Sequence, residues 1–183
     1  MSTEEIRYTR DRDVDDELDR ALIELLSRCF TGPEDEVFRH RRYWKQPPQH
    51  RWYIPQDRSL TAHIAVHEKT LATETGELFC AGIAEVAVDP EYRGHGYAKR
   101  LLEHVHGWLA EQQFDAAVLF GDPRIYRSSG YRVAENPVRY YDDHAGTWKE
   151  QRFADPPGGC FMYRMLRDVP WPDGTIDLRG PKF

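Results

Sequence analysis

The spacing of hydrophobic positions along the chain predicts helices and strands in alternation. Apolar residues three or four apart between Asp15 and Phe30 predict a helix with one apolar face, ended by Gly32-Pro33. The same spacing makes Tyr97 to Gln112 the strongest predicted helix. We expect a further helix from Glu34 to Trp44, where apolar and basic residues are interleaved.

Other stretches have the patterns of strands. Alternation from Leu60 to Leu71, a turn, and then an apolar run from Leu78 to Val88 are typical of antiparallel hairpins. The continuous apolar run from Asp115 to Phe120 predicts a buried central strand. A strand, a helix and a strand in this order predict one right-handed parallel crossover. Further strands are expected at 6–8, 51–54, 131–133 and 160–166, and a short helix at 124–129.

Two stretches have no clear period. Residues 134–157 are long and polar, and residues 168–183 hold Trp171 and three prolines but few periodic apolar positions. We therefore expect 168–183 to be a surface C-terminal tail on a core at about residues 5–167. A chain of 183 residues has one domain by default. The expected fold class is α/β (α+β), a mixed, mostly antiparallel sheet with helices on both faces.

Charge argues against a general nucleic-acid binder. The chain has 25 Lys and Arg against 31 Asp and Glu, a net charge of −6, whereas such binders are usually basic. An acidic surface is compatible with a cationic amine substrate. The local basic run Arg39-His40-Arg41-Arg42 has three interpretations: a nucleic-acid contact, a solvated helix face, or a wall of an acceptor pocket. The acidity of the whole chain favours the solvated face.

Composition also bears on location and on metals. No apolar run approaches 18 residues, so no membrane helix is expected. The stretch Met1–Glu5 is polar and acidic, unlike a secretory signal. Cys29, Cys80 and Cys160 are an odd number at wide spacing, which predicts neither a disulfide framework nor a metal site. We expect a cytoplasmic protein without a metal or a membrane partner.

The most informative stretch runs from Glu85 to Leu102. A buried strand, Glu85-Val86-Ala87-Val88, is broken by Asp89-Pro90, and two glycines then open the predicted helix. Glycines at such a turn allow close approach of a ligand, and a helix N-terminus favours an anion such as a phosphate. The glycine spacing fits neither a dinucleotide fingerprint nor a P-loop. An ordinary tight turn is the alternative.

The turn itself resembles the R/Q-x-x-G-x-G/A signature of the GNAT acyltransferases, which use acetyl-coenzyme A. The matching residues are Arg93-Gly94-His95-Gly96-Tyr97-Ala98. The resemblance covers about residues 50–135. It implies that the backbone of Val86, Ala87 and Val88 binds the pantetheine arm as an added strand. It also implies that main-chain amides from Arg93 to Ala98 hold the pyrophosphate, with charge added by Arg93, Lys99, Arg124 and Arg127.

A second segment, Phe120 to Tyr131, resembles the G-D-P-x-Y-Y-x-x-x-G-F segment of some bacterial GNAT proteins. Ile125 replaces the first aromatic residue, and Tyr131 replaces the usual Phe. The resemblance implies that Tyr126 protonates the leaving thiolate of coenzyme A. A phenol with a pKa of about 10 suits this role because it does not ionise beforehand. The alternative is a tyrosine that only packs.

Attack by an amine also requires a base. Glu85 lies on the central strand where related enzymes often carry a carboxylate, and burial would raise its pKa toward a useful value. Two alternatives are that Glu85 only binds the substrate cation, or that it pairs with an arginine. His63 and His67 on the neighbouring strand are lesser candidates.

The resemblance thus implies acetyl transfer from acetyl-coenzyme A to a primary amine of a small acceptor, by direct attack in a ternary complex. Alternatives are a peptide or protein N-acetyltransferase and a coenzyme-A-binding regulatory module without turnover. A further likeness to aminoglycoside 2′-N-acetyltransferases includes the terminal Phe183, but Ala84 stands where that family has its carboxylate. Dimers are common in the superfamily, so a homodimer is compatible with the resemblance. The acceptor is not identified by sequence.

Overall fold

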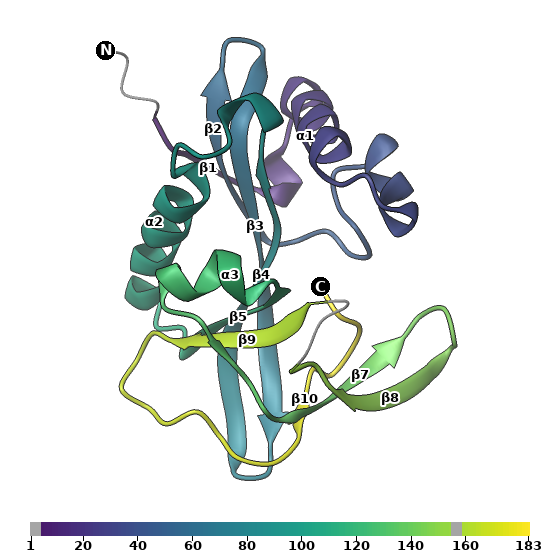
Figure 1. Ribbon diagram of the computed structural model, residues 1–183, viewed down its shortest axis with the longest axis vertical. Coiled ribbons are helices and arrows are strands. Elements are labelled where there is room, and N and C mark those ends of the chain that lie inside the picture. Colours follow the sequence, from purple (N-terminus) through teal and green to yellow (C-terminus); the bar gives the residue numbers. More distant parts are fainter. Residues whose placement is uncertain (1–4, 155–158) are drawn as a thin grey trace. The chain divides into compact units, whose positions relative to one another are not determined.

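The structure is a computed structural model that describes residues 5–154 and 159–183 (Figure 1). Most of the polar N-terminal stretch and the end of the 134–157 segment lie outside the described residues. The helical elements are η1 (Asp11–Asp13), α1 (Asp16–Cys29), η2 (Pro33–Arg39), η3 (Pro90–Tyr92), α2 (Tyr97–Glu111), α3 (Pro123–Tyr126) and η4 (Arg127–Ser129). The strands are β1 (Arg7–Arg10), β2 (His50–Gln56), β3 (Ser59–Thr73), β4 (Gly76–Val88), β5 (Ala116–Gly121), β6 (Arg132–Val133), β7 (Pro137–Asp142), β8 (Thr147–Arg152), β9 (Cys160–Met165) and β10 (Ile176–Asp177).

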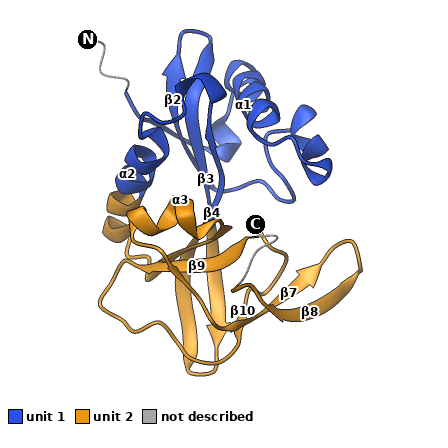
Figure 2. Cartoon of the chain, viewed as in Figure 1, with its two compact units in different colours: residues 1–67, 83–105 blue, residues 68–82, 106–183 orange. Residues whose placement is uncertain are grey.

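The chain divides into two compact units, coloured separately in Figure 2. Unit 1 contains residues up to 67 and 83–105, and unit 2 contains 68–82 and 106–183. The long elements β3, β4 and α2 therefore contribute residues to both units. Each unit has its own cluster of buried apolar side chains.

Unit 1 is built on an antiparallel meander. β1 pairs with β2, and β2 pairs with β3, with Trp52 opposite both Tyr8 and Ile64. Helix α1 begins where Asp15 caps it by accepting a hydrogen bond from the amide of Leu18 at 2.8 Å. The predicted helix is confirmed. The core of this unit comprises Ala21, Leu22, Leu25, Leu26, Phe38, Leu60 and Ala87.

The helix expected from Glu34 to Trp44 is wrong in its second half. Only the short 3₁₀ helix η2 forms, and it ends at Arg39. Beyond it the guanidinium of Arg41 donates to the carbonyls of Tyr43, at 2.9 Å, and of Trp44. These side-chain bonds to the backbone hold the segment in a non-helical path.

Unit 2 contains the predicted parallel pair. β5 runs parallel to β4, with Cys80 opposite Ala116, and antiparallel to β9, with Val118 opposite Tyr163. The strand order is β6-β9-β5-β4-β3-β10-β7-β8, a mixed and mostly antiparallel sheet, as expected. Its buried core comprises Leu71, Cys80, Ala116, Val118, Ala134, Val138, Tyr140, Phe153, Phe161, Ile176 and Leu178.

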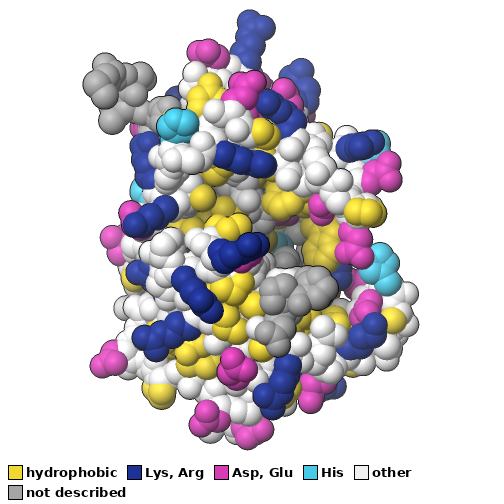
Figure 3. Space-filling view, in the orientation of Figure 1, with side chains coloured by type: hydrophobic (Ala, Val, Ile, Leu, Met, Phe, Trp, Pro, Cys, Tyr) yellow, Lys and Arg dark blue, Asp and Glu magenta, His cyan; other side chains and the backbone are white. Residues whose placement is uncertain are grey.

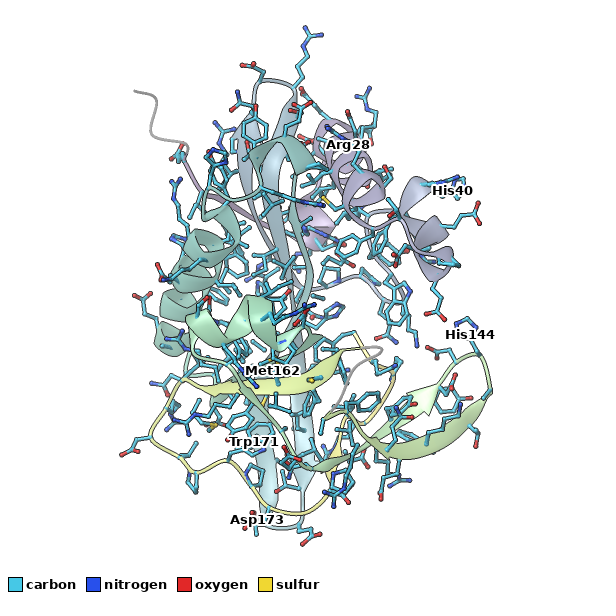
Figure 4. The ribbon with its side chains drawn as sticks, in the orientation of Figure 1. Arg28, His40, His144, Met162, Trp171 and Asp173 are labelled. Atoms are coloured by element: carbon cyan, nitrogen blue, oxygen red, sulfur yellow. The ribbon has the colours of Figure 1, made fainter. Side chains whose placement is uncertain are left out.

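Residues 168–183 do not form a surface tail, so that prediction was wrong. β10 lies between β3 and β7, and Ile176 and Leu178 are buried at 0% and 1% exposure. Only two apolar residues alternate with polar ones here, too few to show a period. Upstream, Trp171 (labelled in Figure 4) stacks on Tyr163 with ring centroids 4.1 Å apart and donates to the side chain of Asn136 at 2.7 Å.

The polar stretch 134–157 forms a hairpin over its described part. β7 pairs with β8 from Pro137 opposite Arg152 to Asp142 opposite Thr147. The carboxylate of Asp142 accepts from the amides of the turn, which fixes it. β8 is exposed along its whole length, which is why no buried pattern marks it in the sequence. Among the described residues, none of the helices has both the length and the apolar composition needed to cross a membrane.

Candidate active site

The turn after β4 is anchored to α1. The side chain of Asp89 caps η3 by accepting from the amide of Glu91 at 2.9 Å. The same carboxylate pairs with Arg28 of α1 at 2.6 Å, and Asp89 is 4% exposed (Arg28 is labelled in Figure 4). The chain that leads into the two-glycine turn is therefore fixed in direction before the turn begins.

The turn has the geometry of an anion-binding loop. Gly94 and Gly96 have φ values of 82° and 80°, which side chains other than glycine rarely adopt. A Cβ built on either glycine would meet none of the described atoms within 4 Å, so the dihedral angle and not crowding selects glycine here. The amide of Arg100 donates to the carbonyl of Gly96 at 3.0 Å, which marks the helix start.

Helix α2 presents its N-terminal end at this turn. The amides of Ala98 and Lys99 have no acceptor within the helix, because the first helical amides lack a preceding turn. The helix is 15 residues long and has no acidic residue in its first turn. Its dipole and these amides favour an anion in the open space above the glycines.

Of the four cations predicted to add charge, two flank this turn. The Nε of Arg93 donates to the carbonyl of Val88 at 3.2 Å, and Lys99 lies 3.9 Å from Glu103 on the exposed helix face. Arg124 and Arg127 belong to unit 2. Arg124 is paired with Asp122 at 2.5 Å.

Glu85 interrupts the regular conformation of β4. Its φ is 51°, in the left-handed region, although it is not a glycine. Its side chain is 5% exposed and both carboxylate oxygens are engaged. Oε1 accepts from the amide of Trp44 and Oε2 from Nη1 of Arg51, each at 3.0 Å. Burial raises the pKa of Glu85, and the charge and hydrogen bond of Arg51 oppose that rise only in part.

Arg51 lies at the centre of the contacts around Glu85. Its side chain is 0% exposed. Besides Glu85, the guanidinium donates from Nε to Asp11 at 2.6 Å, from Nη1 to Nε2 of His63 at 3.1 Å, and from Nη2 to the carbonyl of Arg42 at 2.9 Å. A buried guanidinium is tolerated because its donors are satisfied and two carboxylates balance it.

Arg42 links Asp11 to α1. Arg42 donates to Asp11 at 2.9 Å and to Asp19 of α1 at 2.6 Å. Burial raises the pKa of Asp11, but hydrogen bonds from Arg42 and Arg51 outweigh burial and lower it overall. We call the set formed by Asp11, Asp19, Arg42, Arg51, His63 and Glu85 the Glu85 network.

His63 is held neutral inside the network. It is 0% exposed, and its Nδ1 lies 3.1 Å from the carbonyl of Glu85 while Nε2 faces Arg51. These partners fit a ring that donates from Nδ1 and accepts at Nε2. Burial and the charge of Arg51 lower the pKa of His63 well below 6.5. Both ring nitrogens are engaged, which favours a structural role; His67 is also buried, at 7% exposure.

Tyr126 lies in unit 2 at the end of α3. Asp122 caps this short helix by accepting from the amide of Arg124 at 2.9 Å. The Tyr126 ring covers Gly121 so closely that a Cβ there would lie 2.5 Å from it. Its centroid is 5.9 Å from that of Tyr131, edge to face. Burial raises the pKa of Tyr126 to about 12, so the phenol keeps its proton.

A buried histidine supports Tyr131. Nε2 of His106 lies 2.7 Å from the hydroxyl of Tyr131, and the residues are 4% and 2% exposed. Burial, with the charge of Arg164, lowers the pKa of His106 to about 3. Burial also raises the pKa of Tyr131, so both side chains are neutral. We call Gly121, Tyr126, Tyr131 and His106 the Tyr126 cluster.

The basic run Arg39–Arg42 forms a charged surface only in part, because Arg39 is exposed whereas Arg41 and Arg42 are half-buried. The guanidinium of Arg41 is bound to carbonyls, and that of Arg42 belongs to the Glu85 network. Acidic and basic side chains are interspersed on the face shown in Figure 3. His40 (labelled in Figure 4) is exposed just after η2. Within residues 5–154 and 159–183, His, Cys, Asp and Glu side chains form no group suited to a metal ion.

Sequence reasoning missed Arg51, Asp11 and the pair Arg28–Asp89. Arg51 was assigned only to the strand 51–54, and Asp11 was given no role. The available signal was an arginine inside an otherwise buried strand, since a buried guanidinium requires carboxylate partners. The partner could not be named, because Asp11 and Glu85 lie far from Arg51 in the chain.

Comparison with known families agrees with this geometry. The family model described as acetyltransferase (GNAT) domain matches residues 5–134, which is more than half of the chain. The chain belongs to the GNAT acetyltransferase family. The match includes the two-glycine turn, Glu85 and Tyr126.

One curated relative is similar to this chain over part of the sequence. An uncharacterized N-acetyltransferase of Escherichia coli K12, YhbS, is 38% identical over 58 residues, which are 32% of this chain and 35% of that protein. The matched segment thus spans about a third of the curated relative.

Solved structures extend the likeness over the whole fold. The crystal structure of E. coli YhbS in complex with CoA has a TM-score of 0.66 at 22% identity, covering 95% of this chain and 88% of that one. A GNAT acetyltransferase from Brucella melitensis in complex with acetyl-CoA has a TM-score of 0.54 at 18% identity, covering 89% and 98%. At these identities the likeness shows the fold, a mixed α/β GNAT fold.

Proposed function

We propose that the protein transfers an acetyl group from acetyl-coenzyme A to a primary amine of a small acceptor. The observation that carries the proposal is the turn at 93–96, where two left-handed glycines lead into the N-terminus of α2. This arrangement suits the pyrophosphate of coenzyme A. The structures of YhbS with CoA and of the Brucella protein with acetyl-CoA support the same ligand here.

In this proposal the pantetheine arm pairs with the backbone of β4 beside Val86, Ala87 and Val88. Val86 and Val88 are partly exposed, whereas Ala87 is buried in the core of unit 1. The carbonyl of Val88 already accepts from Sγ of Cys29 and from Nε of Arg93, each at 3.2 Å. The arm would therefore share that acceptor or displace Arg93, and Arg93 would then be released toward the phosphates.

The proposed chemistry is direct transfer. The amine nitrogen attacks the thioester carbonyl carbon, a C–N bond forms, and the C–S bond breaks. The excess proton of the amine passes to Glu85, directly or through water, and Tyr126 donates its proton to the departing sulfur. Burial supports both assignments, since it raises the pKa of each group. The pairing of Glu85 with Arg51 supports the alternative that Glu85 only shapes the acceptor site.

The experiment is a thiol-release screen with acetyl-coenzyme A against polyamines, aminoglycosides, amino acids and peptides. The proposal expects release of free thiol with one class of small amines, together with mass-spectrometric detection of the N-acetylated product. Acetylation of peptides alone would support a protein N-acetyltransferase. Binding of coenzyme A without thiol release from any amine would contradict the proposal and support a regulatory module.

A further inference from the structure

The half-buried ammonium group of Lys182 lies close to three aromatic rings of unit 2. The Nζ of Lys182 lies 5.2 Å from the ring centroids of both Tyr140 and Phe153, and 5.8 Å from that of Phe120. Distances within about 6 Å allow a cation to be attracted to the ring face. Phe120 comes from β5, Tyr140 from β7, and Phe153 follows β8. Residues far apart in the sequence thus form the walls of one cage.

The rings are held in place by contacts that do not involve Lys182. The hydroxyl of Tyr140 donates to the side chain of Gln151 at 3.2 Å, and the carbonyl of Phe153 accepts from the amide of Phe161 at 2.8 Å. Phe120 is fixed in β5 opposite Phe161. The Phe153 ring lies 5.1 Å from Phe120 and 5.8 Å from Tyr140. The cage is therefore formed independently of its occupant.

Lys182 sits just beyond the part of the chain fixed in the sheet. Leu178 donates to the carbonyl of Arg139, and Tyr141 donates to the carbonyl of Gly180, each at 2.9 Å. A Cβ built on Gly180 would meet none of the described atoms within 4 Å. Release of Lys182 from the cage thus requires movement of residues 181–183, including Phe183, whose ring centroid lies 5.7 Å from that of Phe120 and whose ring covers Gly82.

We propose that the cage of Phe120, Tyr140 and Phe153 is a binding site for an alkylammonium group, which Lys182 occupies as an internal mimic of the ligand. The ligand class is a primary alkylamine in its cationic form, such as one end of a linear polyamine or a lysine side chain. As an acceptor subsite this assignment rests on the proposed acetyl transfer.

The test uses tetramethylammonium, which binds aromatic cages and cannot be acetylated. Binding is measured by NMR titration of the aromatic resonances in the wild-type chain and in Lys182→Ala. We expect Lys182→Ala to bind at least about tenfold tighter than wild type, because the competing ammonium is gone. Adding Phe153→Leu should remove the gain. Lys45→Ala is the matched control, since the Lys45 ammonium lies 4.6 Å from the ring centroid of Trp44, which is in unit 1 and is not a cage residue.

Equal binding by wild type and Lys182→Ala would overturn the proposal. If Lys182→Ala does not fold, Lys182→Gln keeps the chain length and removes the charge. Loss of cooperative unfolding in both variants would show that the fold requires Lys182, which also overturns the proposal. Because tetramethylammonium is not a substrate, this result does not depend on turnover. With polyamine acceptors, Lys182→Ala should lower KM and leave kcat unchanged, which separates the cage from the chemistry.

Discussion

The Glu85 network and the Tyr126 cluster both bury polar side chains, but they differ in whether those side chains are charged. The Glu85 network buries full charges, and Arg51 between Asp11 and Glu85 balances them. The Tyr126 cluster buries only neutral groups, with Tyr131 bound to His106 at 2.7 Å. Burial acts in the same direction on Glu85 and Tyr126, raising the pKa of both.

The two groups differ in whether a neighbouring charge opposes the rise in pKa that burial causes. For Glu85 the charge and hydrogen bond of the buried Arg51 limit the rise in pKa that burial causes. For Tyr126 the pKa rises to about 12 from burial, so the phenol stays protonated and can only donate. The acceptor and donor roles that we propose for Glu85 and Tyr126 would thus depend on the same desolvation, with a compensating cation beside Glu85 and none beside Tyr126.

The largest expected effect is on Tyr126→Phe. If this phenol protonates the departing sulfur, the substitution lowers kcat about 10²- to 10⁴-fold, the usual contribution of a general acid. Affinity for coenzyme A, measured by calorimetry, should stay the same because only the hydroxyl is lost. Unchanged turnover would remove Tyr126 as the acid.

Arg51→Met should have the next largest effect. It leaves Asp11 and Glu85 buried without their shared cation, which costs about 3–5 kcal/mol in the free energy of unfolding. Urea denaturation measures this loss. Arg124→Met is the control, because Arg124 and Asp122 form an exposed pair and no measurable change is expected. A stable Arg51→Met protein would refute the view that this arginine balances the network.

Glu85→Gln tests whether Glu85 accepts the proton of the amine. If Glu85 takes the amine proton, activity of the wild type falls as pH drops through its raised pKa, since the protonated carboxyl cannot accept. The glutamine variant should lose about 10²-fold in kcat at neutral pH and show a flattened acidic limb. An acidic limb that persists unaltered in the variant would assign the base to another group and leave Glu85 as a partner of Arg51.

Tyr131→Phe should give the smallest change. It removes the hydroxyl bound to His106 and leaves Nε2 of that buried ring unpaired, which costs about 1–3 kcal/mol in the free energy of unfolding. Thermal or urea unfolding measures the change. Stability equal to wild type would show that water replaces the hydroxyl and that the neutral pair does not stabilise unit 2.

The sequence was sufficient for elements whose signal is local. A segment of about fifteen residues or fewer contains the whole signal for each of three elements: the apolar face of α1, the two-glycine turn, and the short helix ending in Tyr126. β10 was missed because it offers only Ile176 and Leu178, and its place between β3 and β7 depends on pairing with distant strands. Such non-local pairing leaves no periodic pattern in a short segment.

The residues of the candidate site also differ in whether a local signal in the sequence marks them. Glu85 and Tyr126 were predicted through the resemblance, since motifs place them, and their roles stay predictions. Arg51 was not found, because its role depends on Asp11 and Glu85, which are 40 and 34 positions away in the chain. Nor could spacing reveal the cage around Lys182, whose rings come from separate elements of unit 2.

The central claim is that the turn at 93–96 holds the diphosphate of coenzyme A, and isothermal titration with coenzyme A tests it most directly. We predict saturable one-site heat for the wild type and for Gly107→Ala, a glycine within α2 without a left-handed φ. Gly96→Ala should bind more weakly, because alanine is strained at a φ of 80°. Absence of heat and of saturation in the wild type would contradict the account.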